Sequence, residues 1–356
     1  MRCVVLYARR MAPRANRTRW RCRLAAVLAA TAIVALSSPL TVSAQPVRLK
    51  LSFISSDRSA AYLSLVKPFV DAINGDTRNL LKIVVRFSGD AGPVRQQPYL
   101  VSSGKIDIAF ILPGIDPKLF PDETVVELPN LFRDTREASL IHTRLVAANA
   151  LRGYRDFYVI GAVATQPETI HSRKPTASLA DLKGQTLRVN NPIGGEAIGR
   201  LGAASKVMPL NDTGDAISSG VVNGAVVQLA QLADFGVGRL VSHHYLLPVG
   251  SAPLALVMNR KVFDDLPEAA KTLIREHSGA WLAERYIATS DALSRRVLDQ
   301  LYADKRRTVT VPTPADLKVA QRAYAAVTEE WAAASPRHRE LLATVRAEIA
   351  KLRQRK

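Results

Sequence analysis

The sequence Val47-Arg-Leu-Lys-Leu-Ser-Phe53 alternates apolar and polar residues, which is the pattern of a β-strand. Further along, Leu81-Lys-Ile-Val-Val-Arg-Phe87 and Ile106-Asp-Ile-Ala-Phe-Ile111 predict two more strands. Apolar residues at helical spacing predict a helix at 62–73 and another at 96–103. Gly104 is expected to end the second of these helices. This order of strands and helices is that of a parallel α/β domain, and such sheets bind ligands beyond the carboxyl ends of their strands.

The same alternation starts again further on, so the sequence predicts a second α/β domain. Its predicted extended segments are residues 156–163, 185–189, 207–210, 222–227 and 251–258, and its predicted helices are residues 195–201 and 212–220. From Val262 onward the pattern is helical, with long amphipathic stretches over residues 267–304 and 314–353. Two such domains favour a ligand cleft at their junction, which closes by hinge motion.

The first 44 residues have the pattern of an export signal. Eight arginines and no acidic residue precede an apolar run at 24–36, and the small-residue site Val42-Ser-Ala44 follows it. These are the parts of a secretory signal peptide, so we expect cleavage after Ala44 and a periplasmic product. The alternative is a membrane anchor, which is disfavoured because the run is shorter than the roughly 20 apolar residues that span a bilayer.

Both cysteines, Cys3 and Cys22, lie in this segment, so the remaining chain is expected to have no disulfide and no cysteine metal site. The formal net charge of +18 falls to +10 without the eight arginines, since 18 − 8 = 10. Basic residues cluster only near the C-terminus, and aromatic residues are not interleaved with them. We therefore expect no nucleic-acid partner, whereas the positive charge is compatible with attraction of anionic solutes.

The sequence lacks the motifs of common enzymes. It has no G-x-S-x-G elbow, no P-loop, no G-x-G-x-x-G and no H-E-x-x-H. The adjacent His243 and His244 point in different directions on a strand or a helix, so a shared metal ion is not expected. Glu168 and Asp212 could form a carboxylate pair, but nothing in the sequence brings them together. We expect no enzyme activity, no metal ion and no cofactor.

Several ordered segments resemble the substrate-binding subunits of tripartite ATP-independent periplasmic (TRAP) transporters. They are Asp181-Leu-Lys-Gly-Gln-Thr-Leu-Arg-Val189, Leu201-Gly-Ala203, Met208-Pro-Leu-Asn-Asp212 and Ala216-Ile-Ser-Ser-Gly-Val-Val-Asn-Gly224, flanked by Val101-Ser-Ser-Gly-Lys-Ile-Asp107 and Asn259-Arg-Lys-Val-Phe-Asp-Asp-Leu-Pro267. Each segment alone is a weak signal, but their order and spacing agree with the family over nearly all of the chain after residue 44.

The resemblance implies two α/β domains with mixed sheets flanked by helices, joined by crossing strands and by a long helix that contacts both. On this basis we predict one domain from residues 45–165 plus 254–295 and another from residues 166–253 plus 296–356, with the ligand cleft between them. The resemblance also implies capture of a small organic acid and its delivery to membrane permease subunits. The alternatives are a periplasmic ligand sensor that feeds a membrane receptor and, with less support, a periplasmic enzyme.

Arg188 is the predicted centre of the site, because the matching arginine of the family holds the substrate carboxylate. A guanidinium group is always charged, and its paired donors fit a carboxylate. The other candidates lie near predicted strand ends or within the motifs, and they are Ser55, Ser56, Arg95, Asn190, Asp212 and Gln228. Arg95 could supply a second positive charge, or it could simply be exposed to solvent. Helix capping could instead explain the two serines, and loop formation could explain Asn190.

The chain departs from the family at positions that matter for the ligand. The stretch Thr165-Gln-Pro-Glu-Thr-Ile-His171 lacks the second arginine of many members that bind acidic sugars or keto acids. Leu210, Asp212 and Asn223 replace an aromatic residue, a glutamate and an aspartate of the family pattern. We therefore expect a ligand with one carboxylate and a less polar body.

Overall fold

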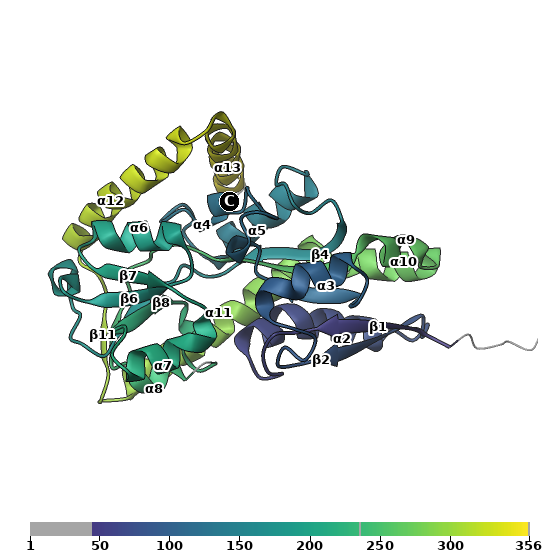
Figure 1. Ribbon diagram of the computed structural model, residues 1–356, viewed down its shortest axis with the longest axis horizontal. Coiled ribbons are helices and arrows are strands. Elements are labelled where there is room, and N and C mark those ends of the chain that lie inside the picture. Colours follow the sequence, from purple (N-terminus) through teal and green to yellow (C-terminus); the bar gives the residue numbers. More distant parts are fainter. Residues whose placement is uncertain (1–44, 235, 355–356) are drawn as a thin grey trace, which may run out of the picture. The chain divides into compact units, whose positions relative to one another are not determined.

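The computed structural model describes residues 45–234 and 236–354, and they contain two mixed β-sheets flanked by helices (Figure 1). The first sheet has five strands in the order β2 (Leu81–Arg86), β1 (Val47–Ser52), β3 (Ile108–Ile111), β10 (Pro253–Asn259) and β4 (Phe157–Ala164). Strands β2, β1 and β3 are parallel, and β10 lies antiparallel between β3 and β4. A strand from late in the chain therefore completes a sheet that the N-terminal strands begin.

The second sheet has six strands in the order β11 (Thr308–Thr310), β9 (His243–Tyr245), β5 (Thr169–Ser172), β8 (Gly224–Val227), β6 (Thr186–Val189) and β7 (Ala204–Val207). Strand β6 is parallel to both β7 and β8, whereas β5 is antiparallel to β8 and β9. The prediction of two mixed sheets with flanking helices is thus confirmed.

The helices pack around both sheets. They are α2 (Lys67–Asn74), α3 (Gln97–Ser102), α4 (Thr124–Glu127), α5 (Thr135–Ala147), α6 (Pro192–Arg200), α7 (Thr213–Ser218), α8 (Val237–Leu240), α9 (Arg260–Asp265), α10 (Glu268–Glu276), α11 (Ala280–Ala303), α12 (Pro314–Ala333) and α13 (Pro336–Gln354). Single turns are η1 (Tyr62–Val66, a π-helical turn), η2 (Val94–Gln96), η3 (Pro113–Ile115), η4 (Leu179–Leu182), η5 (Leu210–Asp212) and η6 (Leu229–Leu232). Among these described helices, none combines the length and the apolar character needed to cross a bilayer.

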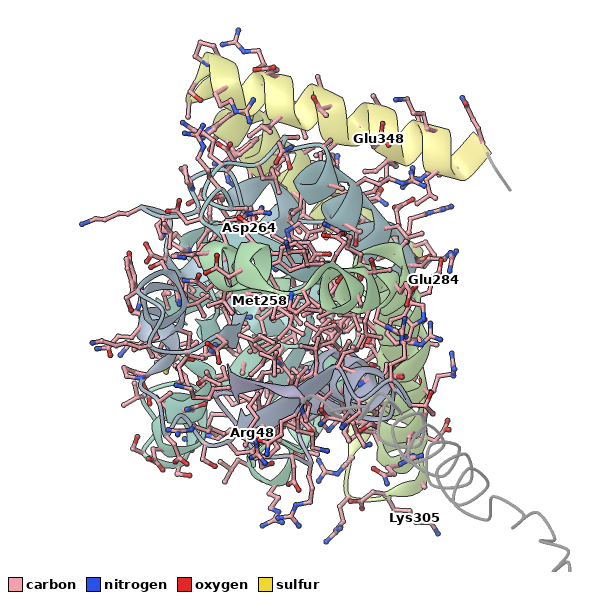
Figure 2. The ribbon with its side chains drawn as sticks, turned by 90° about the vertical axis from the view of Figure 1, so that its right-hand side faces the viewer. Arg48, Met258, Asp264, Glu284, Lys305 and Glu348 are labelled. Carbon is pink, nitrogen blue, oxygen red and sulfur yellow. The ribbon has the colours of Figure 1, made fainter. Side chains whose placement is uncertain are left out.

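The long helix α11 contacts elements of both sheets. On one side it packs against α5, β4 and η1, and on the other it reaches η6 and β11. Figure 2 shows its course between the labelled residues Glu284 and Lys305. The sequence places a helix in this region, and the resemblance implies its contact with both halves of the molecule.

Both faces of the first sheet are covered. On one face Leu49 and Leu51 of β1 pack with Phe69 of α2 and Leu282 of α11. On the other face, a second core joins Ile141 of α5 to residues of α13, among them Leu341, Leu342 and Val345. Helix α13 thus packs against α4 and α5. The predicted domain boundaries stay a prediction. They assign α13 to the second domain, whereas α13 contacts α4 and α5, from residues 45–165, as well as α12.

Several local predictions need correction. Residues 207–210 were expected to be extended, but the strand is Ala204–Val207 and Leu210–Asp212 form a turn. The stretch 267–304 is two helices, because Gly279 at φ +59° breaks the pattern between α10 and α11. Helix α5 and strands β9 and β11 were not predicted from the sequence, and β11 lies between two long helices. The predicted signal peptide falls on residues outside the described part.

Gly224 sits where β8 meets β5, and a Cβ there would lie 2.1 Å from the carbonyl oxygen of His171. Because that neighbour is backbone, it cannot move aside. We predict that Gly224→Ala lowers the free energy of unfolding by about 2 kcal/mol or more.

The matched control is Gly199→Ala in α6, where a Cβ would meet nothing within 4 Å. It should be neutral or stabilising by up to about 1 kcal/mol, since alanine favours helix more than glycine does. Urea unfolding of both variants measures the difference, and equal stabilities would contradict the close approach at Gly224.

Candidate ligand-binding site

A cavity of about 460 Å³ lies where loops of the two sheets meet. The first sheet contributes residues that follow β1, β2 and β3, including Ser55, Ser88 and Leu112. The second sheet contributes residues at or after the ends of β6 and β7, including Arg188 and Met208. These are carboxyl ends of parallel strands, where open α/β sheets place their ligands.

Much of the cavity wall is apolar. The first sheet supplies Phe53, Phe110 and Leu254, and the rings of Phe53 and Phe110 lie 5.2 Å apart between centroids. Met208 and Leu210, from the segment after β7, line the cavity as well. A ligand in this cavity would contact hydrocarbon over part of its surface and polar groups elsewhere.

Arg188 is the central polar residue of the cavity, and only 1% of it is exposed. Its Nε donates to the carbonyl oxygen of Met208 at 3.0 Å, and its Nη2 donates to Oδ1 of Asn190. Its Nη1 is buried and has no hydrogen-bond partner among the described residues. Two of the three nitrogens therefore have partners in the protein, and the third has none among the described residues.

Burial lowers the pKa of Arg188 to about 10, while the negative charges of Glu168 and Asp212 oppose that fall. Arg188 thus stays charged at neutral pH. An unpaired donor on a buried cation costs free energy, and a carboxylate is the acceptor that suits a guanidinium best.

Asn190 connects Arg188 to Glu168, because its Nδ2 donates to Oε1 of that carboxylate. Glu168 is buried and lies in the segment that connects β4 to β5. Its backbone makes hydrogen bonds with Val249 and Gly250. Burial raises the pKa of Glu168 to about 7, while Arg188 and the Asn190 hydrogen bond lower it. The sequence offered no reason to place Glu168 beside Arg188.

Glu127, at the end of α4, is a second buried acid and lines the cavity. Its Oε1 would lie 2.1 Å from a Cβ at position 114, so the close approach requires Gly114. Burial raises the pKa of Glu127 to about 8, helped by the charges of Glu123 and Glu168 and opposed by a hydrogen bond from Asn191.

Asp234 joins the two sides of the cavity. Its Oδ2 accepts a hydrogen bond of 2.9 Å from the backbone N–H of Ala60, which begins the helix after β1. Asp234 itself follows η6 on the second-sheet side and lines the cavity. Burial raises the pKa of Asp234 to about 6, and the hydrogen bond from Ala60 lowers it.

Five of the seven predicted site residues line the cavity, and they are Ser55, Arg95, Arg188, Asn190 and Asp212. Ser56 is exposed, and its carbonyl accepts hydrogen bonds from Ser59 in the turn before the helix. Gln228 is buried and precedes η6, where its carbonyl accepts from Gln231. The cavity-lining acids Glu127 and Asp234 were missed because neither lies in a segment with a recognisable motif.

The histidines lie apart from this cavity. Buried His171 and His244 face each other with 2.9 Å between their Nδ1 atoms, and burial lowers their pKa values to about 3 and about 4. Both are therefore neutral at pH 7, and one donates to the other. Within residues 45–234 and 236–354, no group of three or more His, Cys, Asp or Glu residues could hold a metal ion.

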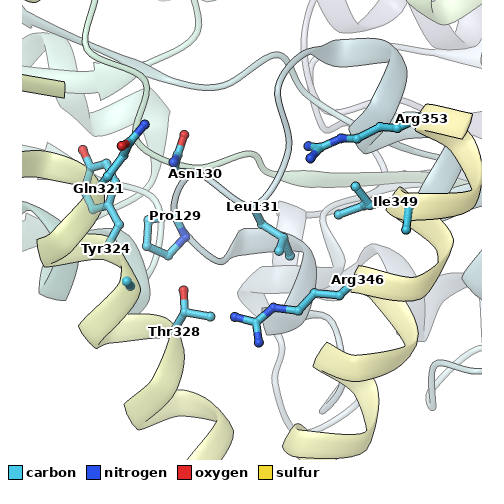
Figure 3. Close-up of a pocket in the computed structure, with 11 residues that line it drawn as sticks. Pro129, Asn130, Leu131, Gln321, Tyr324, Thr328, Arg346, Ile349 and Arg353 are labelled. Carbon is cyan, nitrogen blue, oxygen red and sulfur yellow. The ribbon is translucent and has the colours of Figure 1, made fainter. Parts of the chain in front are cut away.

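A second cavity of about 430 Å³ lies between α12, α13 and the segment after α4 (Figure 3). Arg346 and Arg353 line it, but Arg346 is paired with Glu329, and Arg353 with the buried Glu137. Its cations are already neutralised, so it fits an anion less well than the cavity at Arg188.

Two mixed sheets with a cavity at their strand ends, centred on a buried cation, define a protein that binds a small solute between α/β halves. The chain belongs to the bacterial extracellular solute-binding proteins, family 7, whose sequence model matches residues 51–334. The resemblance to TRAP substrate-binding subunits is thereby confirmed.

Solved structures of TRAP solute-binding proteins share this fold. One from a marine metagenome, specific for aromatic acid ligands and crystallised with 3-hydroxybenzoate, has a TM-score of 0.79 and 21% identity, covering 86% of this chain and 99% of that chain. One from Rhodoferax ferrireducens with copurified benzoate has a TM-score of 0.78 and 24% identity, covering 86% and 98%. The 2,3-diketo-L-gulonate-binding periplasmic protein of Escherichia coli is 25% identical over 318 residues, which are 83% of this chain and 90% of that protein.

We predict that Glu127 makes stability depend on pH. Its pKa of about 8 in the folded protein lies above its ordinary value of 4.5, so the folded state keeps a proton that the unfolded state loses. The stability of the wild type relative to Glu127→Gln is therefore fully present below about pH 4.5. It is lost as the pH rises toward about 8, by at most about 1.4 kcal/mol for each pH unit.

Chemical unfolding of wild type and Glu127→Gln between pH 4.5 and 8 measures this difference. Glu329→Gln, which removes an exposed carboxylate, is the control and should follow the wild type. A pH-independent difference between wild type and Glu127→Gln would show that Glu127 is ionised in the folded protein.

Proposed function

We propose that this protein is the periplasmic substrate-binding subunit of a TRAP transporter, and that it captures a small organic acid through Arg188. The observation that carries the proposal is the buried Nη1 of Arg188, which has no partner among the described residues and belongs to a cavity-lining side chain. A carboxylate bound there would give Nη1 an acceptor and form a charge-assisted hydrogen bond with the guanidinium.

The cavity favours an acid with a compact apolar body. Its volume of about 460 Å³ is within the range for small-molecule sites, and Phe53, Phe110 and Leu254 offer flat or branched hydrocarbon to the ligand. Proteins of the same fold bind benzoate and 3-hydroxybenzoate. An aromatic or similarly apolar monocarboxylate is therefore the ligand class that we infer for this chain.

Transport requires opening and closing of the site. The cavity is lined from both sheets, and the Asp234–Ala60 hydrogen bond spans it, so ligand entry needs these groups to separate. The ligand would then pass unchanged to membrane permease subunits. Export to the periplasm rests on the signal-peptide pattern of residues 1–44.

Arg188→Ala is predicted to abolish ligand-induced stabilisation. An acid present at 100 times its dissociation constant should stabilise the wild type by about 2.7 kcal/mol, which thermal unfolding detects. The test screens a panel of carboxylic acids, including benzoate and 3-hydroxybenzoate.

The matched control is Arg173→Ala, because Arg173 is an exposed arginine just after β5 whose Nη1 donates to the carbonyl of Ile217 outside the cavity. It should keep the stabilisation. Ligand-induced stabilisation that survives unchanged in Arg188→Ala would overturn the role of Arg188.

Arg95 lies exposed at the cavity, and its Nη1 donates to the carbonyl of Ile115 at 2.5 Å. An exposed cation at a binding site chiefly accelerates the encounter with an anion. We predict that Arg95→Ala slows association about two- to fivefold at low salt and leaves dissociation nearly unchanged.

Stopped-flow binding at low and high ionic strength measures both rates, and the effect should vanish at high salt because exposed charges are screened. Arg48→Ala removes an equal charge at the amino end of β1 and is the control (Figure 2). A change confined to the dissociation rate would instead show direct contact between Arg95 and the bound ligand.

A further inference from the structure

Glu168 places a carboxylate close to Arg188, the predicted ligand-binding residue. The series Arg188 Nη2–H to Asn190 Oδ1, then Asn190 Nδ2–H to Glu168 Oε1, links the cation to a buried acid through one amide. The arrangement leaves Nη1 as the one nitrogen of Arg188 without a partner among the described residues. Glu168 therefore orients the guanidinium and also offsets part of its charge from behind.

Apart from Arg188, the cavity has more acidic than basic residues. Its ionisable lining residues in the described part of the chain are Arg95, Arg188, Glu127, Asp212 and Asp234, of which Glu127 keeps its proton at neutral pH. Arg188 is the buried cation among them, whereas Arg95 is exposed and already donates to the carbonyl of Ile115. A ligand held at Arg188 would meet carboxyl groups along the rest of the cavity, and a second cation only at its exposed edge.

Glu168 also occupies the stretch where the resemblance leads one to expect a second arginine. The backbone hydrogen bonds to Val249 and Gly250 fix this stretch, and the side chain of Glu168 points to Asn190. The carboxylate of Glu168 thus lies near Arg188, on the segment where many family members have a second arginine.

We propose that Glu168, acting through Asn190, makes the cavity selective for acids with a single negative charge and excludes dianionic acids. This inference rests on the proposed function, since it assumes that a carboxylate binds at Arg188. The charges of Arg188 and an ionised Glu168 sum to zero, so the pair offers hydrogen-bond donors to one carboxylate but no excess positive charge for another. A second carboxylate would lie near Asp212 or Asp234 without a buried counter-ion, which is strongly unfavourable.

The experiment compares acids that share a carbon skeleton but differ by one carboxylate, namely benzoate with isophthalate and hexanoate with adipate. Isothermal titration at pH 8 gives both dissociation constants for the wild type, Glu168→Gln and Glu168→Asp. Glutamine keeps an oxygen acceptor for Asn190 and removes only the charge. Aspartate keeps the charge on a shorter side chain.

We expect the wild type to bind the monoanion of a pair about 100-fold more tightly than the dianion. Glu168→Gln should reduce this ratio to about tenfold or less, mainly by improving dianion binding, and Glu168→Asp should keep most of it. A residue with a merely structural role would weaken both acids alike and leave the ratio unchanged.

Glu196→Gln, which removes an exposed carboxylate of α6, is the control and should leave the ratio unchanged. Thermal unfolding of each ligand-free variant checks that it folds. The proposal is overturned if the wild type binds both acids of a pair equally, or if Glu168→Gln and the wild type have the same ratio. Absence of binding by every acid, of either charge, would instead contradict the proposed function itself.

Discussion

The burial of a guanidinium group in a largely apolar cavity is the constraint on which the site depends. Arg188 is 1% exposed, so its charge and its donors must be satisfied by the protein or by a ligand. Met208 and Asn190 satisfy two of its nitrogens, and the series through Asn190 to Glu168 supplies a negative charge from within the protein. The protein supplies acceptors for two nitrogens of the cation and leaves Nη1 without one among the described residues, which is the feature that the proposed binding of an acid rests on.

The fold supports that arrangement by bringing distant segments to one place. Strand β6 carries Arg188, the segment between β4 and β5 carries Glu168, and Met208 follows β7. Hydrogen bonds of Glu168 with Val249 and Gly250 tie the segment before β5 to the segment before β10. These two segments connect the first sheet to the second, so Glu168, which bonds Asn190 beside Arg188, lies where the two sheets join.

The sequence predicts the fold well because periodicity and capping are local signals. The alternation at 47–53 and the glycine after 96–103 gave β1 and the end of α3, where Gly104 has φ +73°. Arg188 was found because it lies in an ordered set of motifs. Glu127 and Asp234 could not be found this way, because their role comes from tertiary contacts with Gly114 and with Ala60. Ser56 and Gln228 do not line the cavity, although Ser55 and Gln231, which are close to them in sequence, do.

The position of β10 has a consequence for the order in which the chain folds. Because β10 lies between β3 and β4, the first sheet stays open until residues 253–259 are available. One face of that sheet stays uncovered for longer, since its core includes Leu341 and Val345 of the last helix. Such distant pairings are slow to form, because the entropy of closing a long loop must be overcome first. The nascent chain therefore reaches its native packing only after residues as late as Val345 are available, and its apolar strands depend until then on being kept apart from other chains.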